Sequence, residues 1–269
     1  MPNYDTLAVS SFSAEQFRSD GAYIDYTGRD YIPLRGIDVS EHQGVIDWEA
    51  VRGDGVEFAI IRAGYRGYSE GEIFEDAYFR SNIEGALAAG IKVGIYFFSQ
   101  ALNTEEATEE AQFLLGLLEN YDITLPVFFD WERVGNVGAT RADGVDGKTL
   151  TESCLAFCKI ISDAGYEAGV YFFRSLGYLE YELGRLSGLV FWAAAPGEAP
   201  DFYYKHRIWQ YSFTGEVKGI EKPTDLNILF EELPTGETPS AQLPPAIVPG
   251  ELPPPEVTMP TEAVPTGAN

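Results

Sequence analysis

Short apolar runs alternate with helical patterns between residues 34 and 230 of this chain. Each run is four to seven residues long and is rich in β-branched and aromatic side chains, which favours strands. The runs are continuously apolar, as expected for a parallel sheet that is covered on both faces. The strands that we predict are Gly36–Val39, Phe58–Ala63, Lys92–Phe98, Leu125–Asp130, Glu167–Phe173, Leu189–Ala193, Ile208–Tyr211 and Leu226–Phe230.

Helix start signals lie between the earlier strands. Asn103 and Thr149 are each followed three residues later by a glutamate, which is typical of a helix N-terminus. They predict helices over Thr104–Glu119 and Leu150–Ala164. The later connections, such as 212–224, are too short or too polar for full helices. The pattern therefore predicts an α/β fold, an irregular (β/α) barrel that is TIM-like, with eight strands and fewer than eight helices.

The two ends of the chain differ from this central unit, which we assign to residues 35–232. Residues 1–34 are polar and aromatic without an apolar core of their own, so we expect an N-terminal leader or extension. Residues 233–269 hold ten of the 16 prolines and have no hydrophobic periodicity, which predicts a flexible tail. No stretch approaches the ~18–20 apolar residues of a membrane helix, and no signal peptide is visible.

Charge and cysteine content bear on the possible partners, disulfides and metal sites of the protein. The net charge is -24, from 42 acidic and 18 basic residues, so a nucleic acid partner would be repelled. Cys154 and Cys158 lie one helical turn apart, where a disulfide has poor geometry, and we expect buried free thiols. His, Cys and carboxylate residues do not cluster at the spacing of metal ligands, so we predict no metal and no cofactor. We expect a monomer.

The most informative stretch is the apolar run that ends in Asp130 and Glu132. Because strand side chains alternate between faces, both carboxylates point the same way, with Cβ atoms about 6–7 Å apart. Two like charges at this distance cannot both ionise freely, so one is expected to hold a proton at a raised pKa. A carboxylic acid beside a carboxylate is what breaks a glycosidic bond. Taken alone, the same spacing also fits two solvated residues at a strand end.

In barrels of this kind the reactive groups lie at the C-terminal ends of the strands. Asp38 ends the first predicted strand, and Asp130 with Glu132 ends the fourth. Aromatic residues gather at the same rim, and a rim of carboxylates and rings suits a sugar polymer. We expect about half of these rings to pack in the core instead. The aromatic candidates for substrate binding are Tyr65, Tyr96, Phe98, Tyr171, Trp192 and Trp209.

Six blocks occur in order between residues 34 and 230. They are Gly36-Ile37-Asp38-Val39-Ser40 with His42-Gln43-Gly44, Ile61-Arg62-Ala63-Gly64-Tyr65, Gly94-Ile95-Tyr96-Phe97-Phe98-Ser99, Phe129-Asp130-Trp131-Glu132, Ile208-Trp209-Gln210-Tyr211 and Asp225-Leu226-Asn227. Any one block is weak, but together they resemble glycoside hydrolase family 25, the muramidases often called lysozymes.

The resemblance implies a modified, flattened barrel, and it implies hydrolysis of the β-1,4 bond between N-acetylmuramic acid and N-acetylglucosamine in peptidoglycan. It places the family's acidic positions on Asp38, Asp130, Glu132 and Asp225, with Glu132 as the general acid, and it adds Gln210 to the substrate-binding candidates. Asp130 would attack the sugar or orient the substrate's own N-acetyl oxygen. The D-x-E pair on one strand face favours the second role, because an attacking carboxylate needs the opposite face of the ring.

Partner and location follow from the same resemblance. It implies binding to peptidoglycan glycan strands and an extracellular or cell-surface location. Two alternatives stay open: a non-catalytic cell-wall binding module on the same barrel, and a glycosidase acting on chitin-like N-acetylglucosamine polymers. The long glycine-rich loop Arg133–Lys148 follows the carboxylate pair directly, and we expect it to shape the cleft.

Overall fold

The computed structural model describes residues 4–135 and 139–233. The predicted proline-rich tail lies, from residue 234 onwards, outside the described residues, as do three residues of the loop after Glu132. In the described part of the chain, no helix is both long and apolar enough to cross a bilayer.

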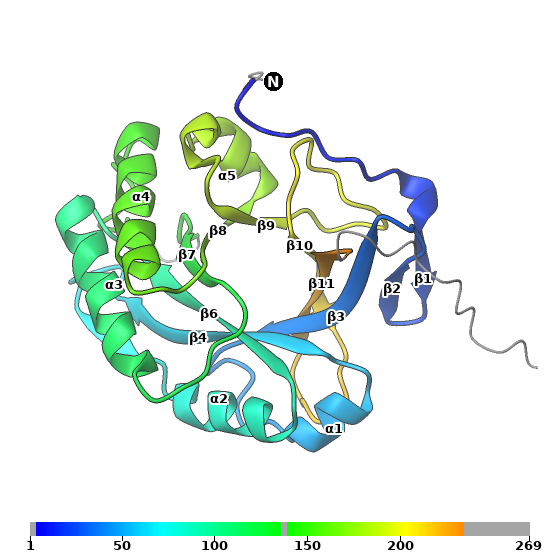
Figure 1. Ribbon diagram of the computed structural model, residues 1–269. Helices are drawn as coiled ribbons and strands as arrows, with labels where there is room; N and C mark the ends of the chain where they lie inside the picture. Colours follow the sequence, from blue (N-terminus) through cyan, green and yellow to red (C-terminus); the bar gives the residue numbers. More distant parts are fainter. Residues whose placement is uncertain (1–3, 136–138, 234–269) are drawn as a thin grey trace, which may run out of the picture. The chain divides into compact units, whose positions relative to one another are not determined.

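Eight strands close into a barrel, in the order β3-β11-β10-β9-β8-β7-β6-β4, and β3 pairs back with β4 (Figure 1). All eight predicted strands are present, and the predicted α/β barrel is confirmed. Their bounds are β3 (Tyr31–Val39), β4 (Phe58–Arg66), β6 (Lys92–Ser99), β7 (Val127–Trp131), β8 (Ala168–Phe173), β9 (Val190–Ala194), β10 (Ile208–Gly215) and β11 (Thr224–Glu232). A short strand, β5 (Ile73–Glu75), forms a hairpin with β4.

The direction of β11 departs from the parallel sheet that we predicted. It runs antiparallel to both β10 and β3, whereas the other neighbours in the barrel are parallel. The connection of residues 216–223 is too short for a crossover, which needs a dozen or more residues. The start of β11 therefore reaches the rim where the parallel strands end, and Asp225 pairs with Asp38.

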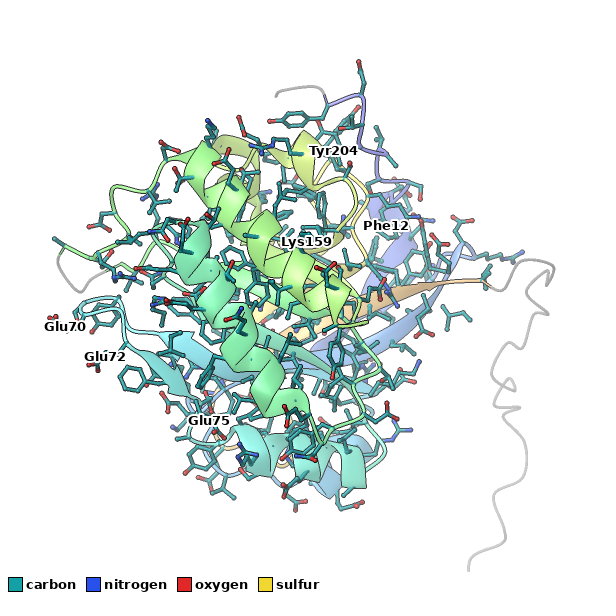
Figure 2. The ribbon with its side chains drawn as sticks, turned by 60° about the vertical axis from the view of Figure 1, so that its left-hand side comes forward. Phe12, Glu70, Glu72, Glu75, Lys159 and Tyr204 are labelled. Atoms are coloured by element: carbon teal, nitrogen blue, oxygen red, sulfur yellow. The ribbon has the colours of Figure 1, made fainter. Side chains whose placement is uncertain are left out.

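Five α-helices are present among the described residues, as expected for an incomplete set. They are α1 (Trp48–Gly53), α2 (Phe79–Ala88), α3 (Thr104–Leu118), α4 (Gly147–Asp163) and α5 (Arg174–Leu179), with short 3-10 turns η1 (Ala14–Gln16) and η2 (Leu183–Leu186). Figure 2 shows α3 and α4 side by side on the outside of the barrel.

The helix termini test the capping predictions. Asn103 caps α3 as predicted, because its side chain accepts a hydrogen bond from the Glu106 amide. The predicted start of α4 was wrong: Asp146 caps this helix by accepting from the Thr149 amide, so the helix begins at Gly147. A capping residue must sit outside the first turn, and Thr149 already lies within it.

The core has two layers. Residues such as Phe58, Phe128 and Trp192 fill the inside of the barrel, and a larger layer packs between the sheet and the helices. Cys154 and Cys158 lie in this outer layer as buried free thiols, as expected. Both faces of the barrel strands are therefore packed, which fixes the strand ends where the sequence predicts the acidic site residues.

The N-terminal segment of residues 4–30 packs against the barrel. It contains the hairpin of β1 (Phe17–Asp20) and β2 (Tyr23–Tyr26), and the ring centroid of Phe12 lies 4.3 Å from that of Phe230 in β11. Figure 1 shows the segment, in blue, beside the connection between β9 and β10. The region that we expected as a leader or extension is therefore held by contacts with the folded unit.

Candidate active site

A cavity of about 490 Å³ opens at the rim of the barrel. It brings together ten of the eleven predicted site residues: Asp38, Tyr65, Tyr96, Phe98, Asp130, Glu132, Tyr171, Trp192, Gln210 and Asp225. Strand alternation explains much of this set, because Tyr96 and Phe98 are two residues apart on β6 and so share a face. The volume is within the usual range of small-molecule sites.

Trp209 is the exception. Its side chain is fully buried in the outer core layer, and its indole Nε1 donates to the Ala195 carbonyl over 2.8 Å. Adjacent strand residues point to opposite faces, so Trp209 and Gln210 cannot both enter the cavity. Gln210 is the one that does.

Asp130 and Glu132 both line the cavity, as their spacing predicts. Burial, then the charges of Glu132 and Asp38, raises the pKa of Asp130 well above its ordinary value. Burial, then the charge of Asp38, raises the pKa of Glu132. One buried oxygen of Asp130, Oδ1, has no hydrogen-bond partner among the described residues. The pair therefore favours protonated forms and leaves an oxygen available in the cavity.

Asp38 is held by two amide side chains. Gln210 Nε2 and Asn227 Nδ2 each donate to Asp38 Oδ2 over 2.8 Å. The orientation of each amide is set by a further donor: Trp192 Nε1 donates to Asn227 Oδ1, and the Tyr171 hydroxyl donates to Gln210 Oε1, both over 2.8 Å. Asn227 was quoted in the sequence blocks but was not among the predicted site residues.

The pKa values of Asp38 and Asp225 are both raised, but by different amounts. Burial raises the pKa of Asp38 to about 6, against the opposing effect of its amide donors. Burial and the charge of Asp38 raise the pKa of Asp225 to about 8. The larger rise at Asp225 favours a proton on Asp225 rather than on Asp38 in this pair of interacting carboxyl groups. Protonation of some of the four carboxyl groups reduces the repulsion between them, so they can lie together in one cavity.

Sequence reasoning missed Arg62 as a site residue. It lines the cavity from β4, its Nε lies 2.7 Å from Asp76 Oδ2, and its Nη2 lies 3.2 Å from Glu41 Oε1. Its charge opposes the rise in the pKa of Asp130. Arg62 stands in the block Ile61-Arg62-Ala63, so a charged residue inside an apolar strand was the available signal.

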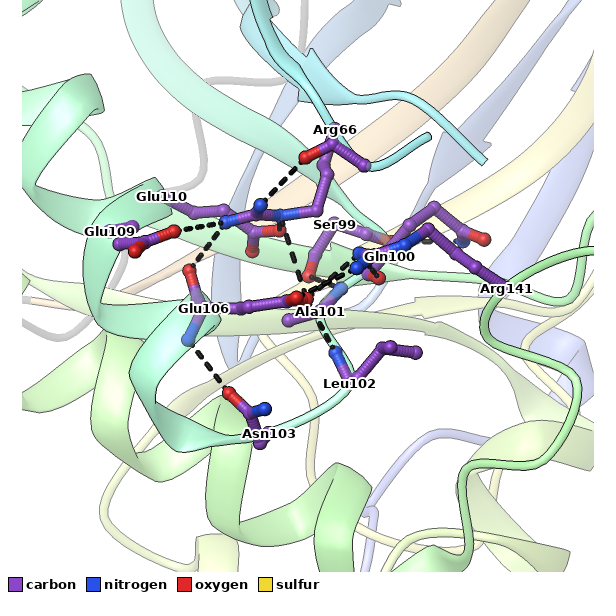
Figure 3. Close-up of polar contacts among 11 residues, drawn as sticks. Arg66, Ser99, Gln100, Ala101, Leu102, Asn103, Glu106, Glu109, Glu110 and Arg141 are labelled. Atoms are coloured by element: carbon purple, nitrogen blue, oxygen red, sulfur yellow. Dashed lines mark hydrogen bonds and ion pairs between the residues drawn. The ribbon is translucent and has the colours of Figure 1, made fainter. Parts of the chain in front are cut away.

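The loop after β7 is anchored to α3 by the network in Figure 3. Arg141 donates to both carboxylate oxygens of Glu106 over 2.7 and 2.8 Å and to the Gln100 carbonyl over 2.9 Å. Gln100 Nε2 in turn donates to the main-chain carbonyl of Glu132 over 2.9 Å. Gln100, which follows β6, thus holds the backbone that carries Glu132, and the described part of the loop is bound to the main chain of Gln100.

Comparisons with known proteins agree with this geometry. The family model described as glycosyl hydrolases family 25 matches residues 37–220. The autolytic lysozyme of Clostridium acetobutylicum is 26% identical over 206 residues, which are 76% of this chain and 58% of that protein. Lysozyme M1 of Streptomyces globisporus is 29% identical over 209 residues, or 72% of this chain and 67% of that protein.

Solved structures point the same way. The modular autolysin LytC from Streptococcus pneumoniae, in complex with a synthetic peptidoglycan ligand, matches with a TM-score of 0.63 and 28% identity, over 73% of this chain and 46% of that one. The bacterial lysozyme from Streptomyces coelicolor matches with a TM-score of 0.59 and 27% identity, over 72% of this chain and 90% of that one. With a family match over more than half its length, on a barrel with acidic residues gathered at its rim, this chain belongs to glycosyl hydrolases family 25.

Proposed function

We propose that this protein is an N-acetylmuramidase that hydrolyses the β-1,4 bond between N-acetylmuramic acid and N-acetylglucosamine in peptidoglycan. The observation that carries the proposal is the pair of Asp130 and Glu132 at the end of β7, in a cavity that they share with Asp38 and Asp225. Related proteins named as lysozymes, and an N,O-diacetylmuramidase of Arthroderma benhamiae that is 27% identical over 201 residues, support it.

Glu132 acts as the general acid in this proposal. A general acid must still hold its proton at the working pH, and burial together with the charge of Asp38 raises the pKa of Glu132 in that direction. It is also less buried than Asp130, so it is better placed to reach a glycosidic oxygen.

Asp130 orients the substrate's N-acetyl group, whose oxygen attacks the sugar. It leaves the same strand end as Glu132, and a carboxylate nucleophile would have to stand on the opposite face of the ring. We therefore expect no covalent sugar on Asp130. A glycosyl ester on Asp130, detected by mass spectrometry after incubation with a slow fluorosugar substrate, would overturn this assignment.

Asp38 and Asp225, which line the same cavity, tune the pair and anchor the substrate. The ionised Asp38, held by Gln210 and Asn227, supplies negative charge that keeps protons on its neighbours. The partly exposed rings of Tyr65, Tyr96 and Phe98, which line the cavity, offer faces for sugar C–H groups. We also propose an extracellular or cell-surface location, where the substrate is found.

Digestion of purified peptidoglycan tests the proposal. We expect new reducing ends that carry N-acetylmuramic acid, identified by borohydride reduction and mass spectrometry of the products. New reducing ends on N-acetylglucosamine would contradict the bond assignment. Cleavage of chitin oligomers at a comparable rate would favour the chitin-like alternative, and binding without turnover would favour the non-catalytic module.

A further inference from the structure

A second, smaller cavity lies beside the first. Its volume is about 260 Å³, and it is formed by the chain after β7 together with the end of β8 and α5. Glu132 lines both cavities, whereas Val134 lines only the larger and Arg133 only the smaller. Of the four clustered carboxyl groups, Glu132 alone belongs to both. It therefore stands at the boundary between the two spaces.

The smaller cavity combines apolar and polar walls. Phe173 is 36% exposed and Leu179 is 82% exposed, so both present apolar surface at this cavity. The ring of Phe213, also partly exposed, lies 6.4 Å from that of Phe173, between centroids, and extends the apolar surface. Apart from Glu132, the lining consists of Arg133, Phe173, Ser175, Leu176, Leu179 and Glu180. An apolar face with a few polar groups at its edge is the usual chemistry of a small-ligand site.

We propose that the smaller cavity binds the leaving sugar, the N-acetylglucosamine on the far side of the scissile bond, with Phe173 and Leu179 as its main apolar contacts. The inference rests on the proposed function. A general acid must touch the glycosidic oxygen, which joins the two sugars. With the other three carboxyl groups in the larger cavity, the sugar attacked at C1 belongs there. Its neighbour then lies on the side of Phe173.

Cleavage of the glycosidic bond is consistent with one sugar in each cavity. The proton of Glu132 passes to the glycosidic oxygen as the bond from that oxygen to C1 breaks, and the leaving sugar departs with a new 4-hydroxyl group. The N-acetyl oxygen of the sugar that is attacked forms the new bond to its own C1, and water later opens that intermediate. The leaving sugar must therefore contact Glu132 without reaching Asp130, as the lining of the smaller cavity provides.

Charge favours a neutral sugar in this position. Arg133 is the cation in the lining, and its Nε already donates to Glu180 Oε1 over 2.8 Å. A lactyl carboxylate, as on N-acetylmuramic acid, would face Glu132 and Glu180 without a free positive partner. N-acetylglucosamine carries no such charge, and its hydroxyl groups can bond to Ser175 and to the Glu180 carboxylate.

Two substrates separate the leaving-sugar site from the rest of the cleft. One is a purified tetrasaccharide of alternating N-acetylglucosamine and N-acetylmuramic acid. The other is the β-fluoride of the N-acetylglucosaminyl-N-acetylmuramic acid disaccharide, whose leaving group fills no sugar site. For Phe173→Ala and Leu179→Ala, we expect the ratio of kcat/KM for tetrasaccharide over fluoride to fall by about tenfold, mainly through KM. Leu179 is so exposed that its variant poses little risk to folding.

Matched controls are Tyr203→Ala and Val45→Ala, which truncate exposed side chains outside both cavities and should leave the ratio unchanged. An unchanged ratio in both test variants, in an enzyme that cleaves both substrates, would overturn the inference and leave the proposed function standing. Equal losses on the two substrates would place these side chains on the wrong side of the bond. A wild-type enzyme that cleaves neither substrate would refute the proposed function, and the inference with it.

Discussion

Asp225→Asn should make the protein more stable at alkaline pH than the wild type. In the folded protein, burial and the charge of Asp38 raise the pKa of Asp225 from 3.8 to about 8. Below pH 3.8 the carboxyl group is protonated in both the folded and the unfolded chain. Between these two pH values the folded protein keeps the proton and the unfolded chain has lost it, so the free energy of unfolding falls as pH rises. Asparagine has no proton to lose.

The size of the effect follows from the two pKa values. Each pKa unit corresponds to about 1.4 kcal/mol, so the four units set a ceiling of about 6 kcal/mol. Asp225 is partly exposed, and solvent screening should leave about a third of this, or about 2 kcal/mol. For a folded unit of this size, we expect the melting temperature of Asp225→Asn to exceed that of the wild type by about 4–8 °C at pH 9.

Thermal unfolding followed by circular dichroism at pH 5, 7 and 9 measures the difference. The gap between the variant and the wild type should be small at pH 5 and should widen steadily toward pH 9. Asp122→Asn, which neutralises an exposed carboxylate outside the cavity, controls for the loss of one negative charge from a strongly acidic protein. A gap that stays constant with pH, or that Asp122→Asn reproduces, would refute the reasoning.

Two further variants test the supports of the site. Arg141→Met removes both hydrogen bonds to Glu106 and should lower the free energy of unfolding by about 2 kcal/mol in denaturant titrations. The control Arg185→Met, at an exposed ion pair, should lower it by less than about 1 kcal/mol. Equal losses in the two variants would mean that the bonds between Arg141 and Glu106 do not stabilise the fold. Phe17→Ala removes a buried ring from the N-terminal hairpin and should cost about 3 kcal/mol. An unchanged unfolding midpoint would show that this hairpin does not stabilise the barrel.

The strands could be predicted because their apolar runs are short and bounded, but the runs carry no direction. Nothing in the run Leu226–Phe230 shows that β11 returns antiparallel, since both faces of a barrel strand are buried either way. Only the shortness of the preceding connection excluded a crossover helix. That reversal is what places Asp225 beside Asp38 at the rim, so the family motif located a residue that strand order alone would have put at the other end.

Two other differences between the sequence-based predictions and the structure have simple physical causes. Trp209 was proposed as a substrate contact because it is an aromatic residue near the end of a predicted strand, but alternation sends its side chain to the face opposite that of Gln210. Residues 4–30 gave no apolar run, because their contribution to packing comes from single aromatic rings such as Phe17 and Tyr26 that meet Phe230 after folding. Isolated rings in polar sequence give no periodic signal.

The central claim is that Glu132 donates the proton that breaks the glycosidic bond. Turnover of purified peptidoglycan by Glu132→Gln, beside the wild type and with a melting curve to verify the fold, tests it most directly. Glutamine keeps the shape of the side chain but has no acidic proton, and we expect turnover to fall by about 10²–10⁴-fold with little change in melting temperature. A folded Glu132→Gln protein that clears peptidoglycan at a near-wild-type rate would contradict the claim.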